Sequence, residues 1–254
     1  MEELKTKSEF EQKKSKYFIS LGFRVREVLE LHKLYNLWGE KDTKEDWRNV
    51  SEHCLVEVGR VKKFAEILNF SEETKNNLIL AAGVHDFYKR YEVEETAKAG
   101  RTWDSYEKVS KEGTEKMYKA GLSPKVIYLA NAPGHYSSLA VMEVLNHQKL
   151  SENDIAFLVM HYVDDYTIGS DWAKKGQLEL RIQHNEANSQ YTILNEEGRR
   201  YYNGKTTFET QREVNKIVAE KLLFFLQENS QNITDSEDIP LFIDEKIKEE
   251  IEKI

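Results

Sequence analysis

The sequence contains little cysteine, proline or glycine, and these shortages limit its fold class. The single cysteine, Cys54, cannot form a disulfide within the chain and cannot supply a thiolate zinc cluster. Only 3 proline and 12 glycine residues occur among 254, too few for a β-sandwich, a low-complexity tract or a collagen-like chain. A chain of this length can bury a full hydrophobic core without covalent cross-links.

Long apolar runs and basic blocks are missing as well. No stretch approaches the roughly 18 apolar residues of a transmembrane helix, so no membrane association is expected. The first segment, MEELKTKSEFEQKKSK, lacks the hydrophobic core and cleavage site of a secretory signal, which predicts a soluble cytoplasmic protein. The net charge of −8 is spread along the chain, and an acidic chain without a basic block is a poor candidate for binding long nucleic acids.

Amphipathic runs dominate what is present, and they predict an all-α fold. Apolar residues recur at helical spacing within 22–38, 47–68, 105–119, 123–131, 139–146, 153–165 and 206–227. Ser71, followed by two glutamates, predicts the start of another helix that reaches about Phe87. The segments LELRIQ and QYTIL instead alternate in polarity, with a turn signal at 195–198, and predict a small β-hairpin within 176–204.

The chain is expected to form one domain with appendages. We predict a flexible N-terminus over 1–16, a helical domain with a C-terminal extension over 17–228, and a linker with a short charged helix over 229–254. That last helix is expected to dock weakly or fray. The helix over 206–227 could serve the domain's own core or a dimer contact, which leaves a homo-oligomer open.

Histidines and aspartates on apolar helices form the main candidate site. His53 lies within one predicted helix, the pair His85 and Asp86 ends the next, and Asp164 and Asp165 end a later one. Burying an imidazole and a carboxylate unpaired among apolar side chains is costly, and one metal ion would satisfy them together. This mixture of nitrogen and oxygen ligands suits Mn, Fe, Co, Ni or Zn, with open positions for water and substrate.

The segments WRNVSEHCLVEVGRV, LAAGVHDFYKR and HYVDD resemble the HD-domain superfamily of metal-dependent phosphohydrolases, from about residue 20 to about 175. The resemblance implies an all-α HD-domain helical bundle that holds one divalent metal ion (Mn, Co, Ni, Fe, Zn or Mg). The implied ligands are His53, His85, Asp86 and Asp164, with Asp165 as the alternative to Asp164. The resemblance also implies that metal-activated water hydrolyses a small phosphoester such as a nucleotide.

Three residues are candidates for contacting that substrate. Lys89 matches the lysine of the H-D-x-x-K branch of the superfamily, which implies a catalytic role beside Asp86 in contacting phosphate or orienting water. The branch that acts on deoxynucleoside monophosphates tends to carry glutamate there, so that particular activity is not expected. Arg60, seven residues after His53, could reach a phosphate or form a surface salt bridge. His135 is a candidate phosphate contact or a capped loop histidine.

Two other functions stay open on the same scaffold. Two-metal members of the superfamily, including diiron oxygenases, carry two further histidine segments before the last aspartate. His135 lies where the second segment would be, but residues 107–113 contain no histidine, which favours one metal ion. A non-catalytic helical sensor or scaffold is the third hypothesis, and it predicts a broken ligand set. His161, one turn before the aspartates, is expected to support them.

Overall fold

The computed structural model describes residues 12–14, 16–18, 21, 23–39, 43–134 and 137–254. Within these residues the chain forms helices and connecting loops, without a strand, as the all-α prediction requires. The α-helices are α2 (Phe23–Leu34), α3 (Arg48–Ile67), α4 (Glu72–Val84), α5 (Lys89–Lys98), α6 (Trp103–Lys119), α7 (Pro124–Ala130), α8 (Ser138–Leu145), α9 (Glu152–Tyr166), α10 (Gln177–Ala187), α11 (Thr192–Glu197), α12 (Thr207–Glu228) and α13 (Ile239–Glu252).

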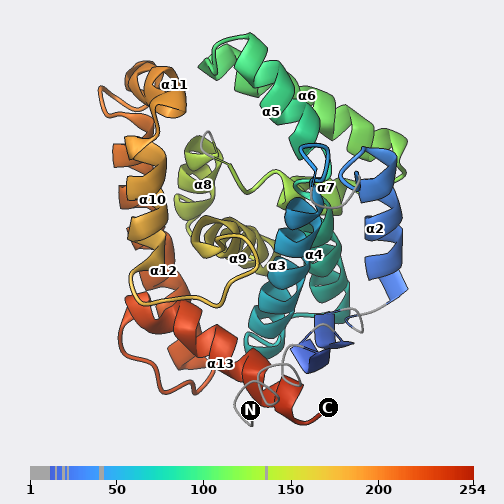
Figure 1. Ribbon diagram of the computed structural model, residues 1–254. Helices are drawn as coiled ribbons and strands as arrows, with labels where there is room; N and C mark the ends of the chain where they lie inside the picture. The colour runs from blue at the N-terminus through green and yellow to red at the C-terminus, as the bar shows by residue number, and fades with distance from the viewer. Residues whose placement is uncertain (1–11, 15, 19–20, 22, 40–42, 135–136) are drawn as a thin grey trace, which may run out of the picture.

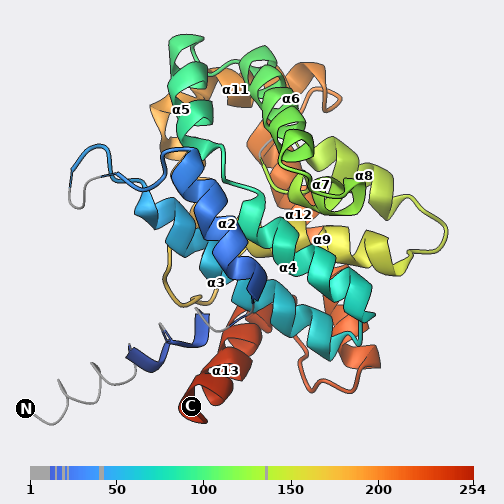
Figure 2. The same cartoon turned by 90° about the vertical axis from the view of Figure 1, so that its right-hand side faces the viewer.

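Helix α3 lies at the centre of the bundle and contacts α4, α9 and α13 (Figure 1). Helices α5 and α6 pack together beyond one end of α4, and α13 lies near the opposite end of α3 (Figure 2). Helices α10 and α12 cover the other side of α9. This arrangement places the end of α4, the middle of α3 and the end of α9 around one point.

The helix starts follow local capping chemistry that the sequence carries. The Ser71 hydroxyl accepts a hydrogen bond from the Thr74 amide at the start of α4, as predicted. Ser123 caps α7 in the same way, with Pro124 in the first turn, where its missing N–H costs nothing. Reciprocal capping boxes begin α9 and α12, so the helix that carries Asp164 near its end has a fixed starting point.

The predicted hairpin within 176–204 is wrong, because this segment is helical. It forms α10, α11 and two short 3-10 turns, Ser189–Tyr191 and Gly198–Arg200. In a strand Leu178, Leu180 and Ile182 would share one face. Instead Leu178 and Ile182, four residues apart, pack inward while Leu180 is 53 % exposed. The apolar residues of LELRIQ therefore follow the four-residue spacing of a helix. The exposed Leu180 between Leu178 and Ile182 made this spacing look like the alternation of a strand.

Helix α13 is part of the core, in contrast to the weakly docked helix that the sequence predicted. Its four isoleucines recur every fourth residue and are each fully buried: Ile239, Ile243, Ile247 and Ile251. They belong to the same apolar cluster as the inner faces of α3, α4 and α9. Helix α5 was not predicted at all, and its composition explains why: six of its ten residues are charged, and only Thr96 is buried. None of the described helices is long and apolar enough to cross a bilayer.

Candidate metal centre

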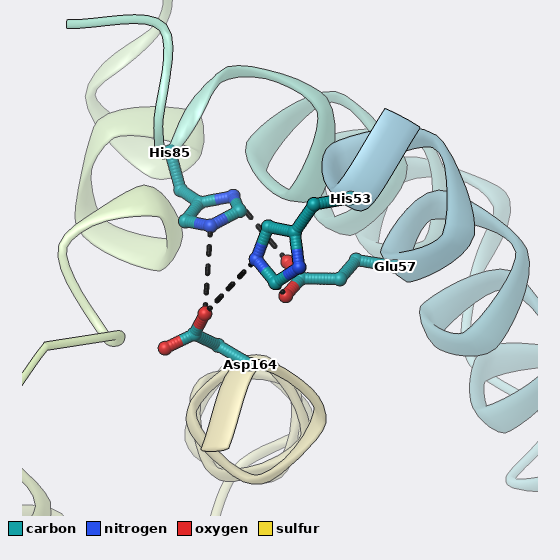
Figure 3. A group of neighbouring side chains, drawn as sticks. All are labelled: His53, Glu57, His85 and Asp164. Atoms are coloured by element: carbon teal, nitrogen blue, oxygen red, sulfur yellow. Dashed lines mark ion pairs between the residues drawn. The ribbon is translucent and has the colours of Figure 1, made fainter. Parts of the chain in front are cut away.

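Four side chains from three helices converge at the centre of the bundle (Figure 3). His53 and Glu57 lie one turn apart on α3, His85 follows the last turn of α4, and Asp164 lies near the end of α9. One nitrogen or oxygen atom from each lies within 4.8 Å of those of the other three. Imidazole and carboxylate groups gathered in this way could hold a metal ion.

The distances within this cluster are short. His53 Nε2 lies 2.9 Å from Glu57 Oε1 and 3.4 Å from Asp164 Oδ1. His85 contacts the same two carboxylates, with Nε2 3.6 Å from Asp164 Oδ1 and Nδ1 3.4 Å from Glu57 Oε2. The side chains of Glu57 and His85 are 0 % and 2 % exposed, so water does not compete for these contacts.

The hydrogen bonding of the cluster fits a bound cation. The oxygens of Glu57 contact the two histidines as ion pairs, but neither makes a hydrogen bond of normal geometry among the described residues, and the same holds for His85 Nε2. Buried polar atoms are normally satisfied, and leaving one without a partner costs about 1–3 kcal/mol. The carbonyls of Ala82 and Gly169 lie 2.9 Å from His85 Nδ1 and 3.4 Å from His53 Nδ1, which orients both rings. The donor set therefore fits a divalent metal ion.

The protonation equilibria point the same way. Burial alone would lower the pKa of His53, but the carboxylates of Glu57 and Asp164 outweigh it and raise that pKa to about 10. Burial would likewise lower the pKa of His85, yet Glu57 holds it well above its usual value. Burial would raise the pKa of Asp164, but Arg181 and the two histidines hold it far below its ordinary range. The buried carboxylates of the site are therefore stabilised by positive charge placed next to them.

The carboxylate predicted beside His85 occupies a different place. Asp86 is outside the cluster of four, with Oδ2 3.7 Å from His85 Nε2 and Oδ1 3.4 Å from Lys89 Nζ. Lys89 Nζ also lies 3.0 Å from Glu92 Oε1. Burial would raise the pKa of Asp86, but Lys89 and then His85 lower it. Asp86 thus stands between the cluster and Lys89 as an ionised carboxylate.

Asp164 and Asp165, adjacent in the sequence, face different parts of the molecule. Asp164 joins the cluster, whereas Asp165 accepts hydrogen bonds from Gln211 and Asn215 on α12. The side chains diverge because consecutive helical residues are about 100° apart. His161, predicted to support the aspartates, contacts Asp165, with Nε2 3.5 Å from its Oδ2.

A cavity of about 200 Å³ opens beside the cluster. His85, Asp86 and Asp164 line one side, and Lys89 and Arg181 bring positive charge to it. Aromatic side chains form much of the remaining wall: Phe87, Tyr88, Tyr106 and Tyr191. A concave site with a few convergent charged groups is the usual form of a small-molecule site.

The two remaining predicted substrate contacts are not found in this cavity wall. Arg60 is fully buried, away from the surface, and donates two hydrogen bonds to Asp244 of α13, at 2.8 and 2.7 Å. It also donates to Thr167 Oγ1 at 2.8 Å. Both sequence interpretations of Arg60 are therefore replaced by a buried ion pair that depends on α13. His135 lies outside the described residues.

Sequence reasoning missed two residues of the site. Glu57 had an available signal, because it is a glutamate one turn after His53 on an otherwise apolar helix face. Arg181 had none, since its segment was predicted to be a hairpin. Its guanidinium donates to the Asp164 and Thr167 carbonyls and lies 3.7 Å from Asp164 Oδ1. It thereby fixes the end of α9 that presents Asp164.

The chain matches no protein-family model, no curated protein and no solved structure. The all-α architecture and the cluster of His53, Glu57, His85 and Asp164 are compatible with an HD-type fold. A functional conclusion therefore has to depend on the chemistry of the cluster and its cavity.

Proposed function

We propose that this protein is a metal-dependent phosphohydrolase that acts on a small phosphoester. One observation carries the proposal: a buried cluster of metal-ligating side chains opens onto a cavity flanked by Lys89 and Arg181. Metal ligands beside two fixed cations suit an anionic group that has to be polarised and held. The resemblance of three sequence segments to the HD-domain superfamily supports the same assignment.

In this proposal His53, Glu57, His85 and Asp164 hold the metal ion. A divalent ion bound there supplies Lewis acidity toward a phosphoryl oxygen and acidifies water. Because Glu57 completes a set of four, Asp86 is left beside the cavity with one oxygen toward Lys89. This differs from the ligand set that the resemblance implied.

Side chains of the protein bind the phosphate, orient the attacking water and exclude other water molecules. Lys89 and Arg181 bind the phosphoryl oxygens from two sides, and Asp86 orients the attacking water and accepts its proton. Hydrolysis joins the water oxygen to phosphorus and breaks the bond from phosphorus to the organic oxygen, which leaves with one proton. The aromatic wall limits the access of other water molecules to the reacting phosphate.

The test combines metal binding with phosphate release. Glu57→Gln keeps the size of the side chain but removes its charge, and Glu52→Gln is the control, because Glu52 is an exposed carboxylate on the same helix. We expect wild type and Glu52→Gln to bind one of Mn, Co, Ni, Fe, Zn or Mg and to release phosphate from phosphomonoesters. Glu57→Gln should bind that metal more than about tenfold more weakly.

Three outcomes would contradict the proposal in different ways. Phosphate release that survives in His85→Ala would indicate a contaminating phosphatase. Equal metal affinity of Glu57→Gln and wild type would remove Glu57 from the ligand set. A protein that binds none of the metals, and whose stability does not change in His85→Ala, would favour the non-catalytic helical scaffold or sensor.

A further inference from the structure

A second buried polar cluster adjoins the cavity, and the proposed chemistry does not use it. Asp165, 3 % exposed, accepts hydrogen bonds at one oxygen only. Gln211 Nε2 donates to Oδ2 at 3.0 Å and Asn215 Nδ2 donates to the same oxygen at 2.6 Å. Asp165 Oδ1 receives no hydrogen bond from the residues that the structure describes. This oxygen is not one of the buried polar atoms that lack a partner, so it is accessible and free to accept a hydrogen bond from a bound molecule.

The two donors on Asp165 are buried with it. Asn215 Oδ1 lies 2.8 Å from His161 Nε2, and Asn215 Nδ2 donates to Asp165 Oδ2 at 2.6 Å. Asn215, Gln211 and His161 are 1 %, 2 % and 0 % exposed. The carboxylate therefore cannot turn both oxygens toward α12. Asp165 lines the cavity, and because Oδ2 is bonded to α12 while Oδ1 is not buried, we infer that Oδ1 is the oxygen that it presents there.

The charge of the cavity limits how much phosphate it can take. Its charged lining residues are Asp86, Glu92, Asp164, Asp165, Lys89 and Arg181. Together with Glu57 of the cluster, five carboxylates stand against two cations, which leaves three negative charges, more than one divalent ion would balance. Lys89 is already shared between Asp86 and Glu92, at 3.4 and 3.0 Å. The cavity therefore has little positive charge to spare for a second phosphate group.

We infer that Asp165 selects the substrate: the cavity takes an ester of a single phosphate whose organic part places a hydroxyl or amino donor on Asp165 Oδ1. This inference rests on the proposed phosphohydrolase function. Asn131 and Asn185 also line the cavity and add polar groups for such a donor-rich organic part. A site built to accept a hydrogen bond discriminates strongly against an analogue that lacks the donor.

Asp165→Asn gives a direct test, because the hydrogen bonds from the surrounding amides favour one orientation of the new side chain. Gln211 and Asn215 both present N–H groups to Oδ2, so the orientation that keeps both hydrogen bonds places the asparagine oxygen toward them. Its NH2 group then faces the cavity, where an acceptor has become a donor. Asp104→Asn is the control, since Asp104 is an exposed carboxylate outside the cavity.

The probes are fructose 6-phosphate, which carries hydroxyl donors, and phenyl phosphate, which carries none on its organic part. We expect wild type to show a higher kcat/KM for fructose 6-phosphate. The ratio of the two kcat/KM values should fall about tenfold or more in Asp165→Asn and stay unchanged in Asp104→Asn. Fructose 1,6-bisphosphate should react at least tenfold less efficiently than fructose 6-phosphate in wild type.

Binding without turnover provides a second readout. Fructose 6-phosphate should raise the Tm of the metal-loaded wild type, and the shift should shrink in Asp165→Asn. Equal ratios in Asp165→Asn and wild type, or an equal or better reaction of the bisphosphate, would overturn this inference while leaving the hydrolase intact. Failure of metal-loaded wild type to hydrolyse any probe, phenyl phosphate included, would overturn the hydrolase and the inference together.

Discussion

Removing the carboxylate of Asp244 should destabilise the whole bundle, because it leaves the Arg60 guanidinium buried without its counter-ion. The two side chains are 0 % and 1 % exposed. Arg60 Nε and Nη2 donate to the two carboxylate oxygens at 2.8 and 2.7 Å. The Ala173 amide donates to Asp244 as well, at 2.7 Å. Asp244→Ala therefore strands a buried cation and a buried N–H group.

The expected loss is about 3–5 kcal/mol of unfolding free energy, the usual cost of breaking a buried pair on one side. For a chain of this size each kcal/mol lowers Tm by about 2–4 °C, so Tm should fall by about 6–20 °C. Urea unfolding at pH 7, followed by circular dichroism, measures the change. Glu249→Ala is the control, because its pair with Lys246 is exposed and should contribute at most about 0.5 kcal/mol.

The double variant Arg60→Met, Asp244→Leu separates the burial of charge from the loss of packing. It removes both charges at roughly constant volume and should recover most of the stability that Asp244→Ala loses. If Asp244→Ala unfolds within 1 kcal/mol of wild type, α13 does not depend on this ion pair. If the double variant is no more stable than Asp244→Ala, stranded charge is not the cause of the loss.

Two further predictions concern stability elsewhere. Burial lowers the pKa of His32 from 6.5 to about 4, so the folded state keeps it neutral while the unfolded state takes up a proton. The contribution of neutral His32 to the free energy of unfolding, on the order of 3 kcal/mol, should be complete above pH 6.5 and be lost as the pH falls to 4. Measured at several pH values, the free energy of unfolding should depend less on pH in His32→Gln than in wild type. Equal pH dependence in the two proteins would refute this. A Cβ at Gly198 would lie 2.4 Å from the Thr207 amide nitrogen, whereas one at Gly113 would meet nothing closer than 3.5 Å. Gly198→Ala should therefore lose about 1–3 kcal/mol and Gly113→Ala should lose none, as thermal unfolding would show.

The sequence determined the fold class because helical periodicity and capping are local. Ser71 and Ser123 cap the helices that they were expected to begin, and the apolar stripe of α3 is readable from its own residues. It also indicated His53, His85 and Asp164, because imidazole and carboxylate groups on apolar helices need a partner when buried. These features depend on neighbours a few residues apart.

Only the tertiary structure decided which groups meet. Asp164 and Asp165 are alike in sequence, and the packing of α9 between α3 and α12 directs one to the cluster and the other to Gln211 and Asn215. Arg60 and Asp244 lie 184 residues apart, so no local pattern could have paired them. The sequence specifies the chemistry of each side chain, but the packing of the helices determines which residues distant in the chain come into contact.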